Sequence, residues 1–298
     1  MSSNRQLLRV LLLGKNGQVG FDLARMLASK AEIHAPDRSV VDLTRPESIR
    51  SAVASFRPDV ILNAAAYTAV DKAESEPQLA AAVNADAPGA LAHAARSANS
   101  LLIHYSTDYV FDGTKQGAYV EEDAIRPLNV YGRTKAAGEE AIANSGCDYL
   151  ILRTSWVFSP RGTNFLLTML RLGHERPELR IVNDQHGAPT SSASIATATL
   201  RILDLWRQST ATRRKELMGR YHATSAGETS WFEFASEVFR NRSGATAPTL
   251  VPISSEEYPT AAQRPRNSVL DCGKLRRTFG IEMPHWRESL LKVMEEIE

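Results

Sequence analysis

The stretch VLLLGKNGQVGFDLARML, residues 10–27, decides the fold. It begins with an apolar run that predicts a buried strand, and it ends with apolar residues at helical spacing. Between them stand Gly14, Gly17 and Gly20. Glycines at such a strand–turn–helix junction permit a tight turn, and they let backbone N–H groups approach an anion at the positive end of the helix. The spacing is GxxGxxG rather than GxGxxG, but its context favours binding of a dinucleotide.

The first half of the chain repeats this alternation of short apolar runs and longer amphipathic segments, which predicts βαβ units and a parallel sheet. Asn84 and Pro88 predict a break in an alanine-rich helical region, because proline is tolerated only in a first helical turn. We expect strands at Val10–Leu13, Ile33–Ala35, Val60–Asn63, Leu101–Tyr105 and Leu150–Arg153, and helices at Gln18–Ser29, Pro46–Phe56, Tyr131–Asn144 and, in two pieces, Pro77–Ala98.

After about residue 160 the alternation becomes irregular. Helices are expected at residues 162–175, at Ser191–Arg207 and in TSWFEFASEVFRNR, where Thr229 or Ser230 is the predicted N-cap. The polar, basic segment Gln208–Arg220 predicts a solvated loop.

The fold class is therefore α/β, with a Rossmann-like doubly wound parallel sheet and a smaller, discontinuous C-terminal substrate lobe. We assign residues 1–160 and roughly 185–208 to the NAD(P)-binding domain and 161–298 mainly to the substrate-binding lobe. The cleft between them is the expected ligand site.

Composition excludes several classes of function. The chain has 298 residues and a formal net charge of +1, so no global charge favours nucleic acid or anionic lipid. Cys147 and Cys272 lie far apart without CxxC spacing, which argues against a disulfide framework and a zinc site. The first apolar run is too short for a membrane span and leads into the glycine loop rather than a cleavage site. We expect a cytoplasmic protein with no membrane partner.

Two acidic residues after the second strand are candidates for the adenosine end of a cofactor. Asp37 suits the ribose hydroxyls of NAD, whereas the neighbouring Arg38 suits the extra phosphate of NADP. Having both favours a site that takes either cofactor. The alternative is a solvated Asp–Arg pair in a loop. Asp42 follows in VVDLT, where it could meet the adenine amino group, beside Leu43.

The segment NVYGRTKAAGEE places Tyr131 four residues before Lys135, so the two side chains share one helix face. A nearby ammonium lowers the pKa of a phenol, which makes proton exchange with a carbonyl oxygen feasible near neutral pH. Thr107 ends a predicted core strand at the rim where open α/β sheets bind ligands. Its hydroxyl could meet the same carbonyl oxygen. The alternatives are an ordinary helix start and a turn-forming hydroxyl.

These residues together resemble an extended short-chain dehydrogenase/reductase, and within that superfamily the dTDP-4-dehydrorhamnose reductase family. The resemblance covers nearly the whole chain. It is carried by the segments LLGKNGQVG, RPDVILNAAAYTAVDKAESEP, IHYSTDYVFDG, PLNVYGRTKAAGE, LRTSWVF, NDQHGAPT and RPRNS. It implies hydride transfer from NADPH or NADH to the ketone of dTDP-4-dehydro-L-rhamnose, which gives dTDP-L-rhamnose.

The resemblance also implies roles for single residues. Tyr131 would donate the proton, Lys135 would lower its pKa and bind ribose, and Thr107 would tune the tyrosine and touch the sugar. Asp108 and Trp156 would also contact the sugar, although without the resemblance Trp156 reads as a core residue. The implied cofactor contacts are Gly14, Gly17, Gln18, Val19, Gly20, Asp37, Arg38, Asp42, Leu43, Ala66, Tyr67, Thr68, Tyr105, Tyr131 and Lys135. From its loop setting we further hypothesise that Arg264 binds the substrate's diphosphate; surface solvation is the alternative.

One departure concerns metal. Some relatives dimerise around a magnesium ion held by acidic side chains. In this sequence GAPTSSASIA has no acid at the corresponding place, and Asp22 is the only remnant in the first helix. We therefore expect no metal, and a monomer or a weak homodimer.

Two other functions stay open on the sequence. An epimerase or dehydratase of the same superfamily would share the glycine loop, but dehydratases follow the Thr-Asp pair with a glutamate, where Tyr109 stands here. A non-catalytic subunit resembling the regulatory subunit of methionine adenosyltransferase could keep the glycine loop and YxxxK. Trp156 favours the reductase over that subunit.

Overall fold

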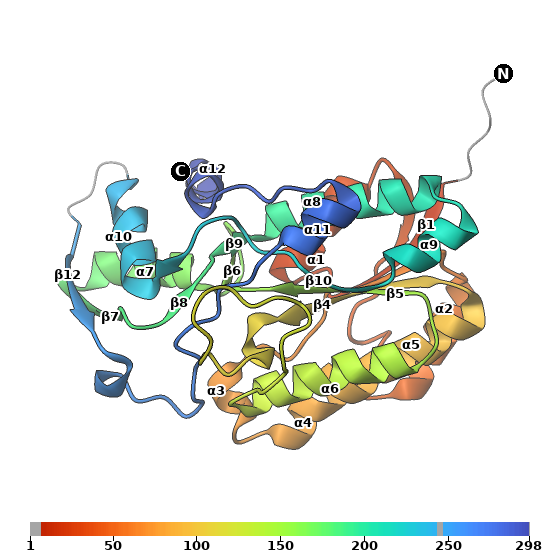
Figure 1. Cartoon of the computed structure of the whole chain (residues 1–298), viewed down its shortest axis with the longest axis horizontal. Helices are drawn as coiled ribbons and strands as arrows, with labels where there is room; N and C mark the ends of the chain where they lie inside the picture. The colour runs from red at the N-terminus through yellow and green to blue at the C-terminus, as the bar shows by residue number, and fades with distance from the viewer. Residues whose placement is uncertain (1–6, 243–246, 298) are drawn as a thin grey trace.

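Six parallel strands form the central sheet of the computed structural model, which describes residues 7–242 and 247–297 (Figure 1). The chain starts in the interior of the sheet and adds strands first on one side and then on the other. This gives the predicted doubly wound sheet, with its switch point beside the first strand. In spatial order the strands are β10 (Gly219–His222), β5 (Tyr149–Thr154), β4 (Leu101–Thr107), β3 (Val60–Asn63), β1 (Leu8–Leu13) and β2 (Ala31–His34).

Helices cover both faces of this sheet, which explains why its strands are apolar runs rather than alternating sequences. Along β1, Val10 and Leu12 pack into one core with α1 and α8, whereas Leu11 and Leu13 pack into a second core with α2 and α5. Figure 1 shows the two helical layers on opposite sides of the sheet. The bounds are α1 (Gln18–Leu27) and α8 (Ser192–Gln208) on one face, and α2 (Pro46–Phe56), α5 (Ala87–Ala98) and α6 (Val130–Asn144) on the other.

The alanine-rich region does not break as predicted. Its first helix, α4 (Pro77–Ala81), runs through a π-helical turn, η1 (Ala82–Asp86), directly into α5. The helical path survives because Asn84 is buried in the turn and its amide bonds the backbone N–H and carbonyl of Tyr67 and, at 3.3 Å, the Thr134 hydroxyl. Pro88 sits in the first turn of α5, directly after the π-helical turn.

The C-terminal lobe has its own apolar core, built around Phe158, Leu166, Phe234 and Trp286. The predicted N-cap is confirmed: Ser230 begins α10 and forms a capping box with Glu233. The elements of this lobe are α7 (Phe165–Glu175), α10 (Trp231–Arg240), α12 (Trp286–Ile297) and the paired strands β7 (Glu178–Val182) and β12 (Thr249–Ile253). Short strand pairs join β6 (Val157–Phe158) to β9 (Thr190–Ser191) and β8 (His186–Gly187) to β11 (Thr229–Ser230).

The prediction of a solvated loop at Gln208–Arg220 is wrong. This segment forms α9 (Ala211–Leu217) and the start of β10, which becomes an edge strand of the central sheet. Two contacts explain its order: Leu217 is fully buried, and the Arg214 guanidinium lies 4.1 Å from the ring centroid of Trp206.

Among the helices of the described residues, none combines the length and the apolar character needed to cross a bilayer.

Candidate active site

The glycine loop between β1 and α1 has the geometry of an anion cradle. Gly14 has a φ of +83° and approaches the backbone of Ala64 so closely that a Cβ there would lie 2.7 Å from its carbonyl carbon. A Cβ on Gly20 would collide with the Gly14 carbonyl oxygen. Gly17 is the N-cap of α1, and no side chain caps its first amides. Those N–H groups and the positive end of the helix dipole therefore remain available to a phosphate.

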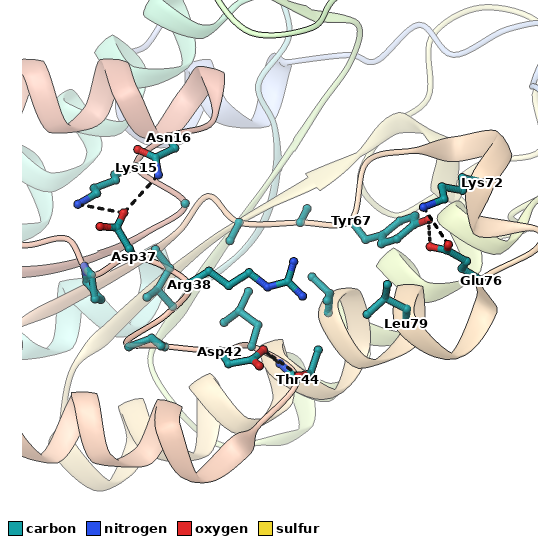
Figure 2. Close-up of a pocket in the computed structure, with 18 residues that line it drawn as sticks. Lys15, Asn16, Asp37, Arg38, Asp42, Thr44, Tyr67, Lys72, Glu76 and Leu79 are labelled. Carbon is teal, nitrogen blue, oxygen red and sulfur yellow. Dashed lines mark hydrogen bonds and ion pairs between the residues drawn. The ribbon is translucent and has the colours of Figure 1, made fainter.

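A cavity of about 460 Å³ opens beside this loop (Figure 2). Asp37 lies in its wall, and its Oδ1 is 3.2 Å from Lys15 Nζ and 3.3 Å from Asn16 Nδ2. Figure 2 shows the Arg38 side chain reaching along the cavity toward Leu79, away from Asp37. The two neighbouring residues are thus not a pair: Asp37 is partly neutralised by Lys15, and Arg38 presents its guanidinium to the cavity.

The far wall of the cavity is set by two further hydrogen-bonded groups. The Asp42 carboxylate accepts hydrogen bonds from the backbone N–H and the hydroxyl of Thr44, which hold the pKa of Asp42 below its usual value. The Tyr67 hydroxyl donates to Glu76, which also pairs with Lys72 at 2.8 Å. Of the remaining predicted cofactor residues, Leu43 and Ala66 line the cavity, Val19 packs against the adjoining core, and Thr68 is exposed.

Two predicted cofactor residues have side chains that are engaged elsewhere. The Gln18 amide oxygen accepts hydrogen bonds from Ser159 and Asn164, so Gln18 ties α1 to the loop after β6. The buried Tyr105 hydroxyl bonds Thr199 of α8 at 2.9 Å. Both side chains are thus committed to protein partners.

The candidate catalytic helix α6 begins in a tightly fitted setting. Asn129 is its N-cap, and its Oδ1 accepts the Gly132 N–H at 2.7 Å. Gly132 packs directly on the Tyr109 carbonyl oxygen, with which any Cβ would collide. Glycine therefore has a steric reason to follow Tyr131 in NVYGRTK: it lets the first turn of α6 lie against the short helical turn, Asp108–Val110, that follows β4.

Tyr131 lies next to Thr107, as the sequence predicts. Burial raises the pKa of Tyr131 to about 12, and a hydrogen bond with Thr107 acts in the opposite direction. The expected effect of Lys135 on this pKa is not seen, because the groups acting on the phenol are Thr107 and, raising it, Asp108. With this pKa the hydroxyl stays protonated at neutral pH, which suits a proton donor.

Lys135 is fully buried beneath the same helix face. Its Nζ donates to the Tyr105 carbonyl at 2.6 Å and bonds His104 Nε2 at 3.0 Å. Burial lowers the pKa of Lys135 to about 8, with the Glu139 carboxylate opposing the shift. Burial, and then the Lys135 charge, hold the pKa of His104 well below its usual value, so the imidazole is neutral.

Asp108 follows Thr107 at the rim of β4 and is almost fully buried. Its Oδ1 accepts the Thr107 hydroxyl at 2.9 Å, whereas its Oδ2 has no hydrogen-bond partner. Burial raises the pKa of Asp108 to about 6, and the neighbouring hydroxyls of Ser268 and Thr107 oppose the shift. The Ser268 hydroxyl itself donates to the His186 carbonyl, so it does not satisfy Oδ2. An unpaired carboxylate oxygen at this depth costs free energy unless a ligand hydroxyl meets it.

A buried ion pair behind the site was missed in the sequence. Arg153 of β5 and Glu139 of α6 are both fully buried and 2.7 Å apart. Glu139 also accepts the Ser106 hydroxyl and the Arg220 guanidinium. The available signal was spacing, since Glu139 stands four residues after Lys135 on the same face of α6. The arginine partner comes from a different strand, and no local pattern indicates it.

Trp156 occupies a strained position at the mouth of the C-terminal lobe. Its φ of +47° places it in the left-handed region, which bulky residues rarely adopt. Its ring stacks on Trp231 with centroids 3.5 Å apart, and Gly187 leaves room for it, because a Cβ at Gly187 would lie 2.6 Å from the indole. Trp156 is only half-buried, so it is a wall residue rather than a member of the core.

A second cavity, of about 1030 Å³, lies in the C-terminal lobe. Its wall combines the aromatic rings of Phe165, Trp231 and Tyr258 with four arginines at 176, 180, 264 and 266. The Arg264 guanidinium, which the sequence assigned to a diphosphate, is bound by both oxygens of Asp71 at 3.1 and 2.7 Å. Arg266 is more exposed and lies 3.7 Å from Glu256.

The described residues contain no cluster of three or more histidine, cysteine or acidic side chains that could hold a metal ion. Asp22, the remnant acid of the sequence, accepts the Ser192 hydroxyl at 2.5 Å and pairs with Arg25 at 3.1 Å. Its carboxylate thus fastens α1 to the start of α8.

Comparison with known proteins decides the family. The sequence model of the RmlD substrate binding domain matches residues 8–298. A dTDP-4-dehydrorhamnose reductase from Burkholderia thailandensis is 48% identical over 95% of this chain and 97% of its own length. The chain belongs to the dTDP-4-dehydrorhamnose reductase family. A second member, from Escherichia coli (strain K12), is 42% identical over 97% of this chain and 98% of its own length.

The fold of the family agrees with the structure described above. The crystal structure of a dTDP-4-dehydrorhamnose reductase from Bacillus anthracis in complex with NADP matches 98% of this chain and 100% of that chain. The TM-score is 0.91 and the identity is 35%. Family membership therefore extends over both lobes and both cavities.

Proposed function

We propose that the protein reduces the ketone of dTDP-4-dehydro-L-rhamnose to dTDP-L-rhamnose with NADPH or NADH, in dTDP-rhamnose biosynthesis. The proposal is supported by the names of its relatives, by the NADP complex of one of them, and by the two cavities of this chain. The observation that carries it is the placement of the Tyr131 phenol beside Thr107, which ends β4 at the carboxyl-terminal rim of the sheet.

The residues at the first cavity fit a dinucleotide. Gly14 and Gly20 leave space that any side chain would fill, and the uncapped start of α1 offers N–H groups for the pyrophosphate. Asp37, Arg38, Asp42 and Leu43 line the part that would take the adenosine. When bound, the nicotinamide supplies the hydride.

The chain's own residues supply the proton and the positioning. The Tyr131 hydroxyl gives its proton to the ketone oxygen as the carbonyl carbon becomes an alcohol carbon, and Thr107 holds the phenol in place. Lys135, fixed by the Tyr105 carbonyl and His104, has one N–H left for a ribose hydroxyl. The partnerless Oδ2 of Asp108 is placed to accept a sugar hydroxyl, and burial of the site removes competing water.

The second cavity is the proposed site for the substrate's nucleotide. Trp231, Tyr258 and Phe165 offer rings to a pyrimidine base, and Arg176, Arg180 and Arg266 offer charge to a diphosphate. Trp156, stacked on Trp231, would then stand between the base and sugar positions. Direct binding of the diphosphate by Arg264 stays a prediction from the sequence, as do a cytoplasmic location and a monomer or weak homodimer.

The competing enzyme function is less well supported by the site. A dehydratase needs a carboxylate after the Thr-Asp pair, and this chain has Tyr109, whose ring packs edge-on against Tyr131 at 5.9 Å. A phenol with a pKa that burial raises further cannot replace a carboxylate in an elimination.

Cofactor consumption tests the proposal. Mixing the purified protein with NADPH and dTDP-4-dehydro-L-rhamnose should decrease the NADPH absorbance by one equivalent per equivalent of ketosugar. An epimerase or dehydratase would convert the sugar with no net loss, and a binding subunit would leave both unchanged. Either of these results would reject the reductase.

A further inference from the structure

Residues 260–268, here called the strap, carry the RPRNS motif and form part of the wall of the larger cavity. The strap is fixed at several points although it has no regular secondary structure. Pro265 packs against Gly113, where a Cβ would lie 2.6 Å from the proline ring. Asn267 donates to the carbonyls of Lys115 and Gly117. The strap is therefore docked on the loop that follows Thr107 and Asp108.

The other end of the strap is bound to α3 (Val70–Ala73). Arg264 meets the Asp71 carboxylate through both of its terminal nitrogens, and the Ala262 N–H donates to the same carboxylate at 3.0 Å. The Arg264 side chain is 21% exposed and that of Asp71 is 46% exposed. The pair is thus a partly shielded, bidentate contact across 193 positions of sequence.

The same two segments hold the first turn of the catalytic helix. Asn129, the N-cap of α6, donates through Nδ2 to the Gln263 carbonyl of the strap at 2.8 Å. Glu74, which follows α3, accepts the Val130 N–H at 2.7 Å. Asn129 and Val130, which precede Tyr131, are therefore held by the strap and by Glu74 after α3. These are the two segments that the Asp71–Arg264 pair joins.

Arg264 also reaches the catalytic tyrosine through one intermediate ring. Burial raises the pKa of the Tyr109 hydroxyl, and the charge of Arg264 and a hydrogen bond to it act in the opposite direction. The Tyr109 ring then packs edge-on against Tyr131, with an interplanar angle of 79°. Tyr109 thus lies between the charge of Arg264 and the ring of Tyr131.

We propose that the Asp71–Arg264 ion pair is a latch that positions Tyr131 for proton transfer, and that Arg264 acts as a positioning residue rather than as a ligand of the diphosphate. The inference rests on the proposed function, because it takes Tyr131 as the proton donor. Four contacts connect the pair to the start of α6: Asp71 with Arg264, Asp71 with Ala262, Asn129 with Gln263, and Tyr109 with Tyr131.

Steady-state kinetics of Arg264→Met, Asp71→Asn and the double variant test the latch. A displaced catalytic group loses rate steeply, so we expect kcat to fall about tenfold to a hundredfold for Arg264→Met. The KM for the ketosugar and the Kd for NADPH should change less than about threefold. Because both side chains act through one contact, the double variant should lose no more than Arg264→Met alone.

Arg9→Met is the matched control. Arg9 of β1 pairs with Glu32 of the edge strand β2 at 3.1 Å, with side chains 33% and 50% exposed, and it makes no contact with the strap. It should lower the Tm as Arg264→Met does, but leave kcat unchanged. If Arg264→Met raises the KM for the ketosugar with kcat intact, Arg264 is a substrate ligand and the latch is wrong. If it changes only the Tm, the latch is also wrong. Arg264→Lys, which keeps the charge but lacks the fork, replaces Arg264→Met if the latter does not fold.

Amide hydrogen exchange provides a readout that needs no substrate. The latch predicts faster exchange of the Val130 and Gly132 amides in Arg264→Met and no change in Arg9→Met. Equal exchange in both variants would reject the latch. Absence of turnover by the wild-type protein would instead reject the proposed function, so the two failures are separate.

Discussion

At the residue scale, burial acts in opposite directions on the two groups that face the proposed reaction. It raises the pKa of Tyr131 to about 12 and lowers that of Lys135 to about 8. The Tyr131 phenol therefore carries its proton at neutral pH, whereas the Lys135 ammonium begins to lose its proton only slightly above neutral pH. The sequence predicted that the lysine activates the tyrosine. In the structure the two share a helix face, but the lysine is directed toward the Tyr105 carbonyl and His104.

Tyr131→Phe should remove the proton donor and little else. We expect kcat to fall about a hundredfold or more, because general acid catalysis contributes on that order. NADPH binding, measured by fluorescence titration, should stay within about twofold, since the hydroxyl meets no phosphate. Near-normal turnover would show that another group donates the proton.

The pH dependence of reduction should reflect Lys135. Its lowered pKa means that the ammonium is present below about pH 8 and is lost as the pH rises through that value. We expect kcat/KM to decline above about pH 8, while Tyr131, with a pKa of about 12, remains protonated. If kcat/KM stays constant up to pH 10, the decline cannot be assigned to Lys135 and this prediction is wrong.

At the element scale, close approach of α6 to its neighbours places the catalytic face. Gly132 lets its first turn rest on the Tyr109 carbonyl, and Gly138 lets its middle rest on the π-helical turn at the Asn84 carbonyl. Asn84 in turn bonds Thr134 of α6 and the Tyr67 backbone in the wall of the cofactor cavity. The π turn is therefore part of how the first cavity and α6 are held together.

Gly138→Ala should destabilise the protein although alanine is the better helix former. The added Cβ would collide with the Asn84 carbonyl, and overpacking of this kind costs about 1–3 kcal/mol. Gly89→Ala on α5 is the control, because its Cβ would lie 3.3 Å from the Ala141 Cβ and meet only a side chain. Chemical denaturation should show a clear loss for Gly138→Ala and less than about 1 kcal/mol for Gly89→Ala. Equal stability of the two variants would contradict the close contact.

At the scale of the whole molecule, the sequence predicted the features that depend on residues close together in the chain. The five first strands, the glycine loop, the Ser230 cap and the position of Thr107 follow from patterns within about a dozen residues. The partner of Arg264 lies 193 positions away, and the partner of Glu139 comes from a neighbouring strand, so neither contact has a local signature. The segment Gln208–Arg220 was mistaken for a loop because its order depends on Trp206 and a buried Leu217.

The arrangement of the first cavity predicts use of both cofactors. Lys15 neutralises part of Asp37, and Arg38 faces the cavity, so a ribose hydroxyl and a phosphate can each find a partner. NADH and NADPH should both support turnover, with kcat/KM values less than several hundredfold apart, roughly the span of one or two charge-assisted contacts. Arg38→Met should weaken NADPH selectively. Equal loss with both cofactors would mean that Arg38 does not read the phosphate.

Transfer of the hydride itself tests the central claim most directly. NADPH carrying deuterium at both C4 positions of its nicotinamide is incubated with the protein and dTDP-4-dehydro-L-rhamnose, and the sugar product is examined by mass spectrometry and NMR. We predict one deuterium, bound to the former ketone carbon, and a Tyr131→Phe variant that forms this product far more slowly. A product without deuterium, or full activity of the variant, would contradict the account.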